Sequence, residues 1–208
     1  MSIPQIADFV RIVFFTGAGM SAESGVPTYR GQGGIWKQYD YERYACQAAF
    51  DRDPEGVWEF HNYRRGLVGA CRPHRGHDVI VAAEQQRPQA TVVTQNIDEM
   101  HQLAGSTGVT ELHGSLWKLR CDACGATHYG YESPLADLHC ASCGAYWRPG
   151  IVWFGDMLHE PTVQSAIQQI GQCELLVAIG TSAVVFPAAQ LPRIAAANGA
   201  LLVEINPE

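Results

Sequence analysis

A short apolar run, residues 12–15, leads directly into the glycine-containing stretch TGAGMSAESGVPTYRG at residues 16–31. The run has the composition of a buried parallel strand, and Gly17, Gly19 and Ala22 then form a G-x-G-x-x-A pattern. Glycines at these places permit a tight turn and let backbone amides come close to a pyrophosphate. The stretch therefore predicts an α/β fold that binds a nucleotide, although the pattern alone is also typical of an ordinary turn.

The residues after this loop disfavour an ordinary dehydrogenase. In such enzymes one uninterrupted helix leads to a second strand, whose acidic end holds the ribose about 20 residues after the loop. Here Pro27 and Gly31 interrupt any helix, and Asp40, near the expected distance, follows no apolar strand. Hydride transfer is therefore disfavoured, whereas nucleotide binding is not.

Strands and helices alternate along the rest of the chain. Asp53 followed by Pro54 is a helix start, because the carboxylate can cap the first turn and proline fits the first helical position. The alternation predicts an α/β fold with a doubly wound, parallel, Rossmann-like sheet. Further strands are expected at residues 90–94, 109–112, 148–156, 175–179 and 200–205, and further helices at residues 4–10, 76–86, from 161 onward and at 187–197.

Polar residues follow two of these strands. The motif TQNID, residues 94–98, ends one strand, and His113 follows the next. Because the carboxyl ends of parallel strands meet at one edge of a sheet, both groups are predicted to line one crevice. An imidazole with a pKa of about 6.5 suits a general base, and the alternative is a buried histidine whose hydrogen bonds are satisfied.

Four of the seven cysteines form two close pairs, Cys121 with Cys124 and Cys140 with Cys143. This spacing is typical of a zinc ribbon, and four thiolates leave no open coordination position. A structural Zn²⁺, one per chain, is therefore predicted, in preference to redox chemistry or a chance pattern. The other three are expected to be small core residues: Cys46, Cys71 and Cys173.

Composition limits the class of partner. The 208 residues are 47% hydrophobic and carry a formal net charge of −7, which disfavours general binding to nucleic acid or an anionic membrane. A cationic partner such as a lysine-rich protein tail fits better. The sequence shows no apolar run of membrane-spanning length and no secretory signal, and its thiols suit a reducing compartment, so a cytoplasmic protein is expected.

Several motifs occur together in one order: TGAG with PTYR, TQNID, the histidine of ELHGS, the two cysteine pairs, RPGIVWFGDML, GTSAVVFPA and EINP. With these motifs the sequence resembles, over nearly its whole length, the sirtuins, which are NAD-dependent protein-lysine deacylases. The resemblance implies a reaction in which the acyl oxygen of an acyl-lysine attacks C1′ of the nicotinamide ribose. The implied products are nicotinamide, free lysine and 2′-O-acyl-ADP-ribose.

The resemblance also implies roles for individual residues. His113 matches the catalytic histidine and Asn96 a second catalytic position. Tyr29 stands where the family commonly has phenylalanine, Glu99 where a small or another polar residue is common, and Asp156 where glutamate is usual. The positions that match NAD contacts are Gly17, Ala18, Gly19, Ala22, Ser24, Tyr29, Arg30, Gln95, Asn96, Ile97, Asp98, Gly180, Thr181, Ser182 and Asn206.

On the substrate side, Val152, Trp153, Phe154 and Gly155 resemble the strand that pairs with the backbone of the substrate peptide. Sirtuins that prefer acidic acyl groups have a small alanine and a Tyr-x-x-Arg pair at positions that match three residues here: Ala45, His61 and Arg64.

These three residues predict removal of succinyl or malonyl groups besides acetyl. Arg64 can grip a terminal carboxylate, and His61, in place of the tyrosine, would add positive charge when protonated. Acidic specificity is then expected to strengthen as the pH falls. The alternative is that both side chains lie on a solvated helix face.

Two other functions compete with the deacylase: an NAD hydrolase or ADP-ribosyltransferase on the same fold, and a zinc-ribbon interaction protein without catalysis. Sirtuins continue past Asn-Pro with elements that reach the adenine, whereas this sequence stops at Glu208, so the adenine side is expected to be built differently or the sequence to be shortened. The expected division is a Rossmann-like NAD-binding domain (residues 1–30, 73–120 and 149–208), a helical cofactor-loop and acyl-pocket segment (residues 31–72) and a zinc-ribbon module (residues 121–148).

Overall fold

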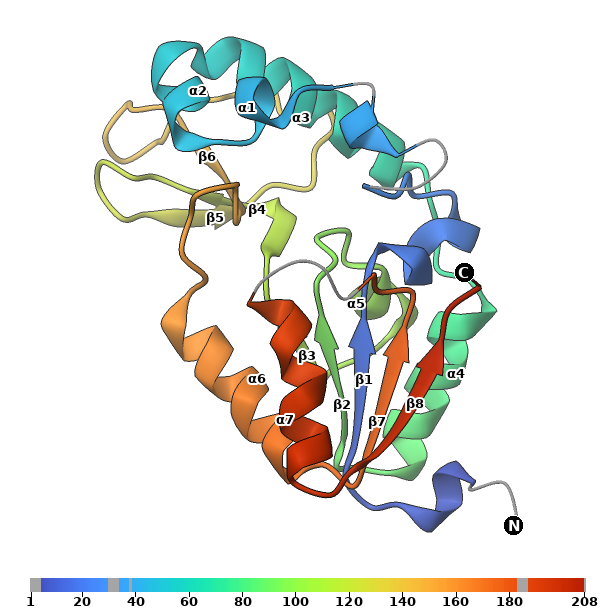
Figure 1. Ribbon diagram of the computed structural model, residues 1–208. Helices are drawn as coiled ribbons and strands as arrows, with labels where there is room; N and C mark the ends of the chain where they lie inside the picture. Colours follow the sequence, from blue (N-terminus) through green and yellow to red (C-terminus); the bar gives the residue numbers. More distant parts are fainter. Residues whose placement is uncertain (1–4, 30–33, 38, 183–186, 208) are drawn as a thin grey trace.

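The computed structural model describes residues 5–29, 34–37, 39–182 and 187–207 of the chain. A five-stranded parallel sheet, in the order β3-β2-β1-β7-β8, forms its larger part (Figure 1). The chain winds outward in opposite directions from β1 and β7, which confirms the predicted doubly wound fold. The strands are β1 (Ile12–Thr16), β2 (Ala90–Thr94), β3 (Val109–Glu111), β7 (Leu175–Ile179) and β8 (Leu201–Ile205).

Helices cover both faces of this sheet (Figure 1). Phe14 packs in one apolar cluster with Ile80 of α4, whereas its neighbour Phe15 packs in another with Ile170 of α6 and Leu191 of α7. Because successive side chains of a strand point to opposite faces, a strand covered on both sides must be apolar throughout. This explains the continuous apolar run of β1. The helices are α4 (Arg75–Gln86), α6 (Glu160–Gln172) and α7 (Leu191–Ala197).

Above the sheet lies a helical layer packed on a second, smaller sheet. Asp53 accepts a hydrogen bond of 2.9 Å from the Gly56 amide and Pro54 begins α3, as predicted. Buried Trp58 of α3 donates to the carbonyl of Trp147 at 2.6 Å, and buried Arg65 donates to that of Leu116 at 2.6 Å. These bonds fasten α3 to the small sheet. The helices here are α1 (Tyr41–Tyr44), α2 (Gln47–Arg52) and α3 (Pro54–Gly69).

The small sheet corrects two expectations. It is antiparallel, in the order β5-β4-β6, and β4 was not predicted. β6 pairs with β4 and does not return to the large sheet. Gly114 permits the change of direction after β3, since it has a φ of +74° and an added Cβ would lie 2.1 Å from the Gly150 carbonyl oxygen. The strands are β4 (Gly114–Arg120), β5 (Thr127–Tyr129) and β6 (Arg148–Ile151).

The small sheet also bears on the division of the chain. Residues 121–148 alone leave out β4 and most of β6, the strands on either side of the cysteine pairs. We propose residues 114–151 as the limits of the zinc-ribbon module.

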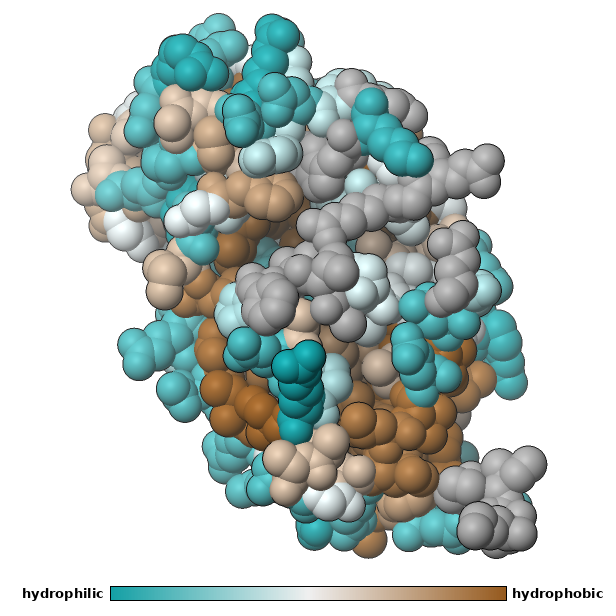
Figure 2. Space-filling model, in the orientation of Figure 1, coloured by the Kyte–Doolittle hydropathy of each residue, from teal (hydrophilic) through white to brown (hydrophobic). Residues whose placement is uncertain are grey.

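One edge of the large sheet is apolar and exposed. On β8, Leu201, Leu202 and Ile205 are 39%, 43% and 54% exposed, and Figure 2 shows hydrophobic side chains gathered over this edge. An edge strand of a parallel sheet can accept a further strand or a covering helix. No helix in the described part of the chain is both long and apolar enough to cross a membrane.

Three histidines are buried without charge: His61, His77 and His101. Burial, with smaller contributions from nearby basic groups, lowers the pKa of His61 to about 3, that of His77 to about 4 and that of His101 to about 3. In the unfolded chain each would titrate near its ordinary pKa of about 6.5. Between these values the unfolded chain takes up protons that the folded chain does not.

We therefore expect the three histidines to have no destabilising effect above pH 6.5. As the pH falls from 6.5 toward 4, their protonation in the unfolded chain should lower the free energy of unfolding. Each histidine contributes up to about 1.4 kcal/mol per pH unit to the loss of unfolding free energy. Thermal melting at pH 7.5, 6.5 and 5.5 measures it. A variant His101→Gln should show a shallower slope, whereas exposed His159→Gln should keep the wild-type slope. Equal melting temperatures at pH 7.5 and 5.5 would contradict the expectation.

Candidate active site and metal centre

Three loops meet where β1, β2 and β7 end. Thr16 pairs with Thr94 on one side and with Ile179 on the other, so the three strands end at one level. Gln95, after β2, donates its side-chain amide to the Thr181 hydroxyl after β7 at 2.9 Å. The predicted crevice therefore lies at the switch point of the sheet, where doubly wound folds bind ligands.

The glycine loop has a different physical role from the one that its pattern suggests. The amides of Gly17 and Gly19 donate to the carbonyls of Ile179 and Gly180, at 3.0 and 2.9 Å. A Cβ added at either glycine would lie 2.7 Å from atoms of Gly180. The glycines thus let two loops pack in backbone contact, and residues 18–24 then form a short 3-10 helix.

Asn96 and Asp98 are held firmly on the floor of the crevice. Asn96 is buried and donates to the Gly17 carbonyl at 3.0 Å and to the Ser21 hydroxyl at 3.2 Å. The carboxylate of Asp98 accepts the Met100 amide at 3.0 Å, and burial raises its pKa. The sequence analysis did not predict a role for the buried Ser21. Its hydroxyl, inside the glycine loop, was the feature that could have indicated one.

His113 has a defined tautomer. Its Nδ1 lies 2.9 Å from the backbone carbonyl oxygen of Gln95, which can only accept a hydrogen bond. Nδ1 therefore carries the proton, and Nε2 presents a lone pair. Burial lowers the pKa of His113, so the imidazole is neutral at pH 7. This is the state that a general base requires.

Glu99 is turned away from the crevice. It has a φ of +59°, which is rare for a residue with a side chain. Its carboxylate accepts hydrogen bonds from the Ser115 hydroxyl and, at 3.4 Å, from Tyr131. The Glu99 carboxylate is thus held by hydrogen bonds outside the crevice. Burial, and to a smaller extent the charge of Glu99, raise the pKa of Glu111 to about 7.

Arg64 of α3 and Tyr29, which follows the glycine loop, meet at the crevice. Arg64 is 3% exposed and donates from Nη2 to the Tyr29 hydroxyl at 2.9 Å. Both residues line a small cavity together with seven polar and apolar residues: Ala18, Val26, Pro27, Val68, Asn96, Ile97 and Asp98.

Ala45 and His61 lie in the adjoining core, and both are buried. The alternative of a solvated helix face for His61 and Arg64 is therefore wrong. His61 Nε2 lies 3.2 Å from the Tyr44 carbonyl oxygen, and its ring stacks on Trp153 with centroids 5.8 Å apart. With its pKa lowered to about 3, His61 stays neutral, so acidic specificity cannot strengthen through its protonation near pH 6.

Residues 152–155 do not form the expected strand. They follow β6 as a coil and turn, and Gly155 has a φ of +89°. The amides of Val152 and Phe154 donate to the carbonyls of His113 and Ala45, at 2.9 and 3.0 Å. These donors are engaged within the chain, so pairing with a peptide at them would require the bonds to exchange.

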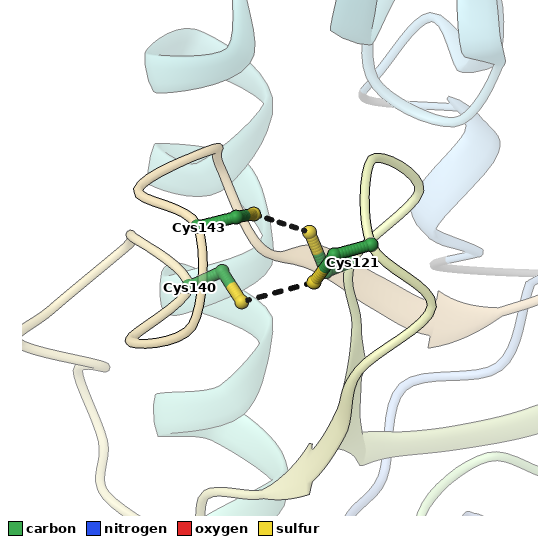
Figure 3. Close-up of side chains that lie close together, drawn as sticks. Cys121, Cys140 and Cys143 are labelled. Atoms are coloured by element: carbon green, nitrogen blue, oxygen red, sulfur yellow. Dashed lines mark hydrogen bonds between the residues drawn. The ribbon is translucent and has the colours of Figure 1, made fainter.

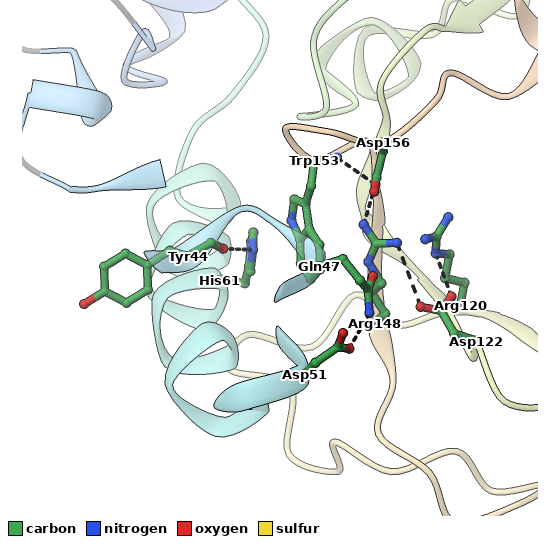
Figure 4. A network of polar contacts seen from close by, with 9 residues as sticks. All are labelled: Tyr44, Gln47, Asp51, His61, Arg120, Asp122, Arg148, Trp153 and Asp156. Carbon is green, nitrogen blue, oxygen red and sulfur yellow. Dashed lines mark hydrogen bonds and ion pairs between the residues drawn. The ribbon is translucent and has the colours of Figure 1, made fainter. Parts of the chain in front are cut away.

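A buried ion pair fixes this turn (Figure 4). Arg148 of β6, 2% exposed in its side chain, pairs with the carboxylate of Asp156, which also accepts the Trp153 amide at 3.0 Å. The guanidinium lies 3.9 Å from the centre of the Trp153 ring, and Figure 4 shows Trp153 between Arg148 and His61. Arg148 Nη1 also lies 3.9 Å from Oδ2 of Asp122, a residue that stands between Cys121 and Cys124 in the sequence. Sequence reasoning missed this role of Arg148.

The four predicted cysteines converge, and Figure 3 shows three of them, Cys121, Cys140 and Cys143, side by side. The sulfurs of Cys121, Cys124, Cys140 and Cys143 all lie within 4.8 Å of one another. A tetrahedron with Zn–S bonds of about 2.3 Å has sulfur–sulfur edges of about 3.8 Å, so the arrangement fits Zn²⁺. The two cysteine pairs lie in matching turns. The backbone amides of Gly125 and Gly144 donate to the backbone carbonyl oxygens of Cys121 and Cys140, each at 2.8 Å. The cysteines therefore form a closed structural metal centre.

The remaining candidate residues lie around the same crevice, except Arg30, which is outside the described residues. Ser24 Oγ is buried, and no hydrogen-bond partner for it occurs in the described part of the chain. Asn206 donates to the Thr181 carbonyl at 3.3 Å, while Ala22 and Ser182 are exposed. A buried hydroxyl without a partner among the described residues can hydrogen-bond a polar ligand such as NAD.

Known proteins match this chain over most of its length. A model of the Sir2 family matches residues 17–187. The chain is 43% identical over 201 residues to an NAD-dependent protein deacylase of Aquifex aeolicus, covering 96% of this chain and 84% of the relative. It is 46% identical over 198 residues to NAD-dependent protein deacylase 2 of Pyrobaculum aerophilum, covering 94% of this chain and 79% of that relative. The crystal structure of a Sir2 homologue with NAD superposes with a TM-score of 0.90 at 40% identity, covering 98% and 80%.

Proposed function

Because the chain belongs to the Sir2 family, the sirtuins, we propose that it is an NAD-dependent deacylase of protein lysine side chains. The proposed products are nicotinamide, free lysine and 2′-O-acyl-ADP-ribose. The observation that carries the proposal is the neutral His113, whose Nδ1 is bonded to Gln95 and whose Nε2 is left as a base beside the switch-point crevice.

The chain's own groups suit this reaction. When bound, NAD supplies the ribose carbon from which nicotinamide can leave. His113 would accept a proton from a ribose hydroxyl at Nε2. Buried Asn96, oriented by Gly17 and Ser21, would hold the ribose side, and Tyr29 would shield the cavity from water.

Incubation with NAD and matched acetyl-, succinyl- and glutaryl-lysine peptides, followed by mass spectrometry, tests the proposal. Deacylated peptide and acyl-ADP-ribose should appear together and only with NAD. Equal consumption of NAD with and without acyl peptide would favour an NAD hydrolase instead. No consumption of NAD under any condition would favour a zinc-ribbon interaction protein.

We propose further that acidic acyl groups are removed at least as well as acetyl. Arg64 supports this, since its buried guanidinium has no carboxylate bonded to it among the described residues. Asp98 lines the same cavity and interacts electrostatically with Arg64 without an ion pair, so the guanidinium can still favour an anionic ligand. Ala45, in the adjoining core, adds only a methyl group to this region.

The variant Arg64→Met should lower kcat/KM for succinyl-lysine peptide about ten- to a hundredfold, because hydrogen bonds to charged groups contribute about 1.5–3 kcal/mol. The acetyl peptide should lose much less. Arg75→Met, on the exposed start of α4, is the matched control and should change neither rate. Equal losses on the two peptides would mean that Arg64 supports the fold or the cofactor and does not read the acyl chain.

A further inference from the structure

Tyr29 and Arg64 form a contact between two distant parts of the chain. Tyr29 follows the glycine loop, whereas Arg64 belongs to α3. The Arg64 Nη2 donates to the Tyr29 hydroxyl at 2.9 Å, and the guanidinium carbon lies 4.9 Å from the centre of the Tyr29 ring. A phenylalanine, the more common residue at this position in sirtuins, would keep the ring contact but not the hydrogen bond.

Arg64 is otherwise poorly solvated. It is 3% exposed, and its Nε has no hydrogen-bond partner among the residues that the structure describes. The neutral hydroxyl of Tyr29 is a weaker acceptor for a guanidinium than a carboxylate would be. Tyr29 therefore occupies an N–H donor at Nη2 that an acidic acyl chain could otherwise use.

We propose that Tyr29 is a specificity-determining residue, whose hydroxyl competes with acidic acyl groups for Arg64. The inference rests on the proposed deacylase function. An acetyl group has no carboxylate and leaves the Tyr29–Arg64 hydrogen bond intact. A succinyl carboxylate that binds the guanidinium through Nη2 must replace that bond, so part of its binding free energy is lost. Tyr29 thus narrows the difference in affinity between acidic and neutral acyl groups.

Calorimetric binding of two peptides that differ only in an acetyl- or succinyl-lysine, without NAD, tests this inference on the full chain. In Tyr29→Phe the ratio of succinyl to acetyl affinity should rise about tenfold over wild type, since a bond to a charged group is no longer broken. General effects of the substitution on the fold act on both peptides and cancel in the ratio.

Two further variants complete the test. In the double variant Tyr29→Phe with Arg64→Met, the ratio should fall to that of Arg64→Met alone, because the hydroxyl then has no donor to occupy. Tyr129→Phe, which removes the hydroxyl of a half-exposed tyrosine on β5, should leave the ratio at the wild-type value.

An unchanged or lower ratio in Tyr29→Phe would overturn the inference, as would a wild type that binds neither peptide. Failure of the proposed function is a separate result. In that case wild-type protein binds the peptides but removes no acyl group when NAD is added, while the affinity ratio still reports on Tyr29.

Discussion

Replacement of His113 by alanine is expected to reduce deacylation 10²- to 10⁴-fold, the usual effect of removing a general base. The imidazole is neutral and correctly oriented, because Gln95 holds the Nδ1 proton and burial lowers the pKa of the ring. Alanine removes the lone pair at Nε2 without removing a core contact of the sheet. Initial rates with saturating NAD and acetyl-lysine peptide measure the loss.

The fold and NAD binding should survive in this variant. Melting temperature and calorimetric titration with NAD report on these two properties. The control His159→Ala removes an exposed imidazole at the start of α6 and should keep the wild-type rate. A loss below about tenfold in His113→Ala would place the base elsewhere.

Loss of the zinc centre is expected to have the largest effect on stability. The variant Cys121→Ala leaves three thiolates, and structural zinc contributes on the order of 10 kcal/mol in zinc-finger peptides. Cys121 and Cys140 pack in the same apolar core as Trp58 and Trp147, whose hydrogen bond fastens α3 to the small sheet. Melting temperature, solubility and activity should therefore all fall, although none of the four paired cysteines lines the cavity of the crevice.

Metal content separates this effect from a simple core mutation. Elemental analysis should give one zinc per wild-type chain and much less for Cys121→Ala. Cys173→Ala, at a buried cysteine in the apolar cluster of Phe15 and Ile170, should keep one zinc per chain. Active wild-type protein without metal would refute the structural zinc.

Much of the fold could be predicted because its signals are local. The apolar run of β1, the Asp53 cap of α3 and the glycine turns of the cysteine knuckles each depend on a few adjacent residues. β4 escaped prediction because it begins at Gly114, directly after His113, without a break in polarity. Its partner β6 was assigned to the wrong sheet, since pairing depends on Gly114 meeting Gly150 across the chain.

The candidate site divides in the same way. The sequence identified His113, Asn96 and the four cysteines, because strand ends and metal-ligand spacing place these groups by local geometry. It could not show that Asn96 depends on Ser21, or that Trp153 lies between Arg148 and His61. The contacts of Asn96 with Ser21 and of Trp153 with His61 join residues that are tens of positions apart, and no local pattern encodes them.

By itself, then, the sequence determined the doubly wound sheet, the metal centre and the residues at the crevice, because periodicity and spacing act within single elements. Only the tertiary structure decided the chemical state of the groups. Burial makes His61 a neutral core residue, the Gln95 carbonyl gives His113 its basic Nε2, and Tyr29 engages Arg64. Solvation and hydrogen-bond partners set these states, and both arise only when distant segments pack together.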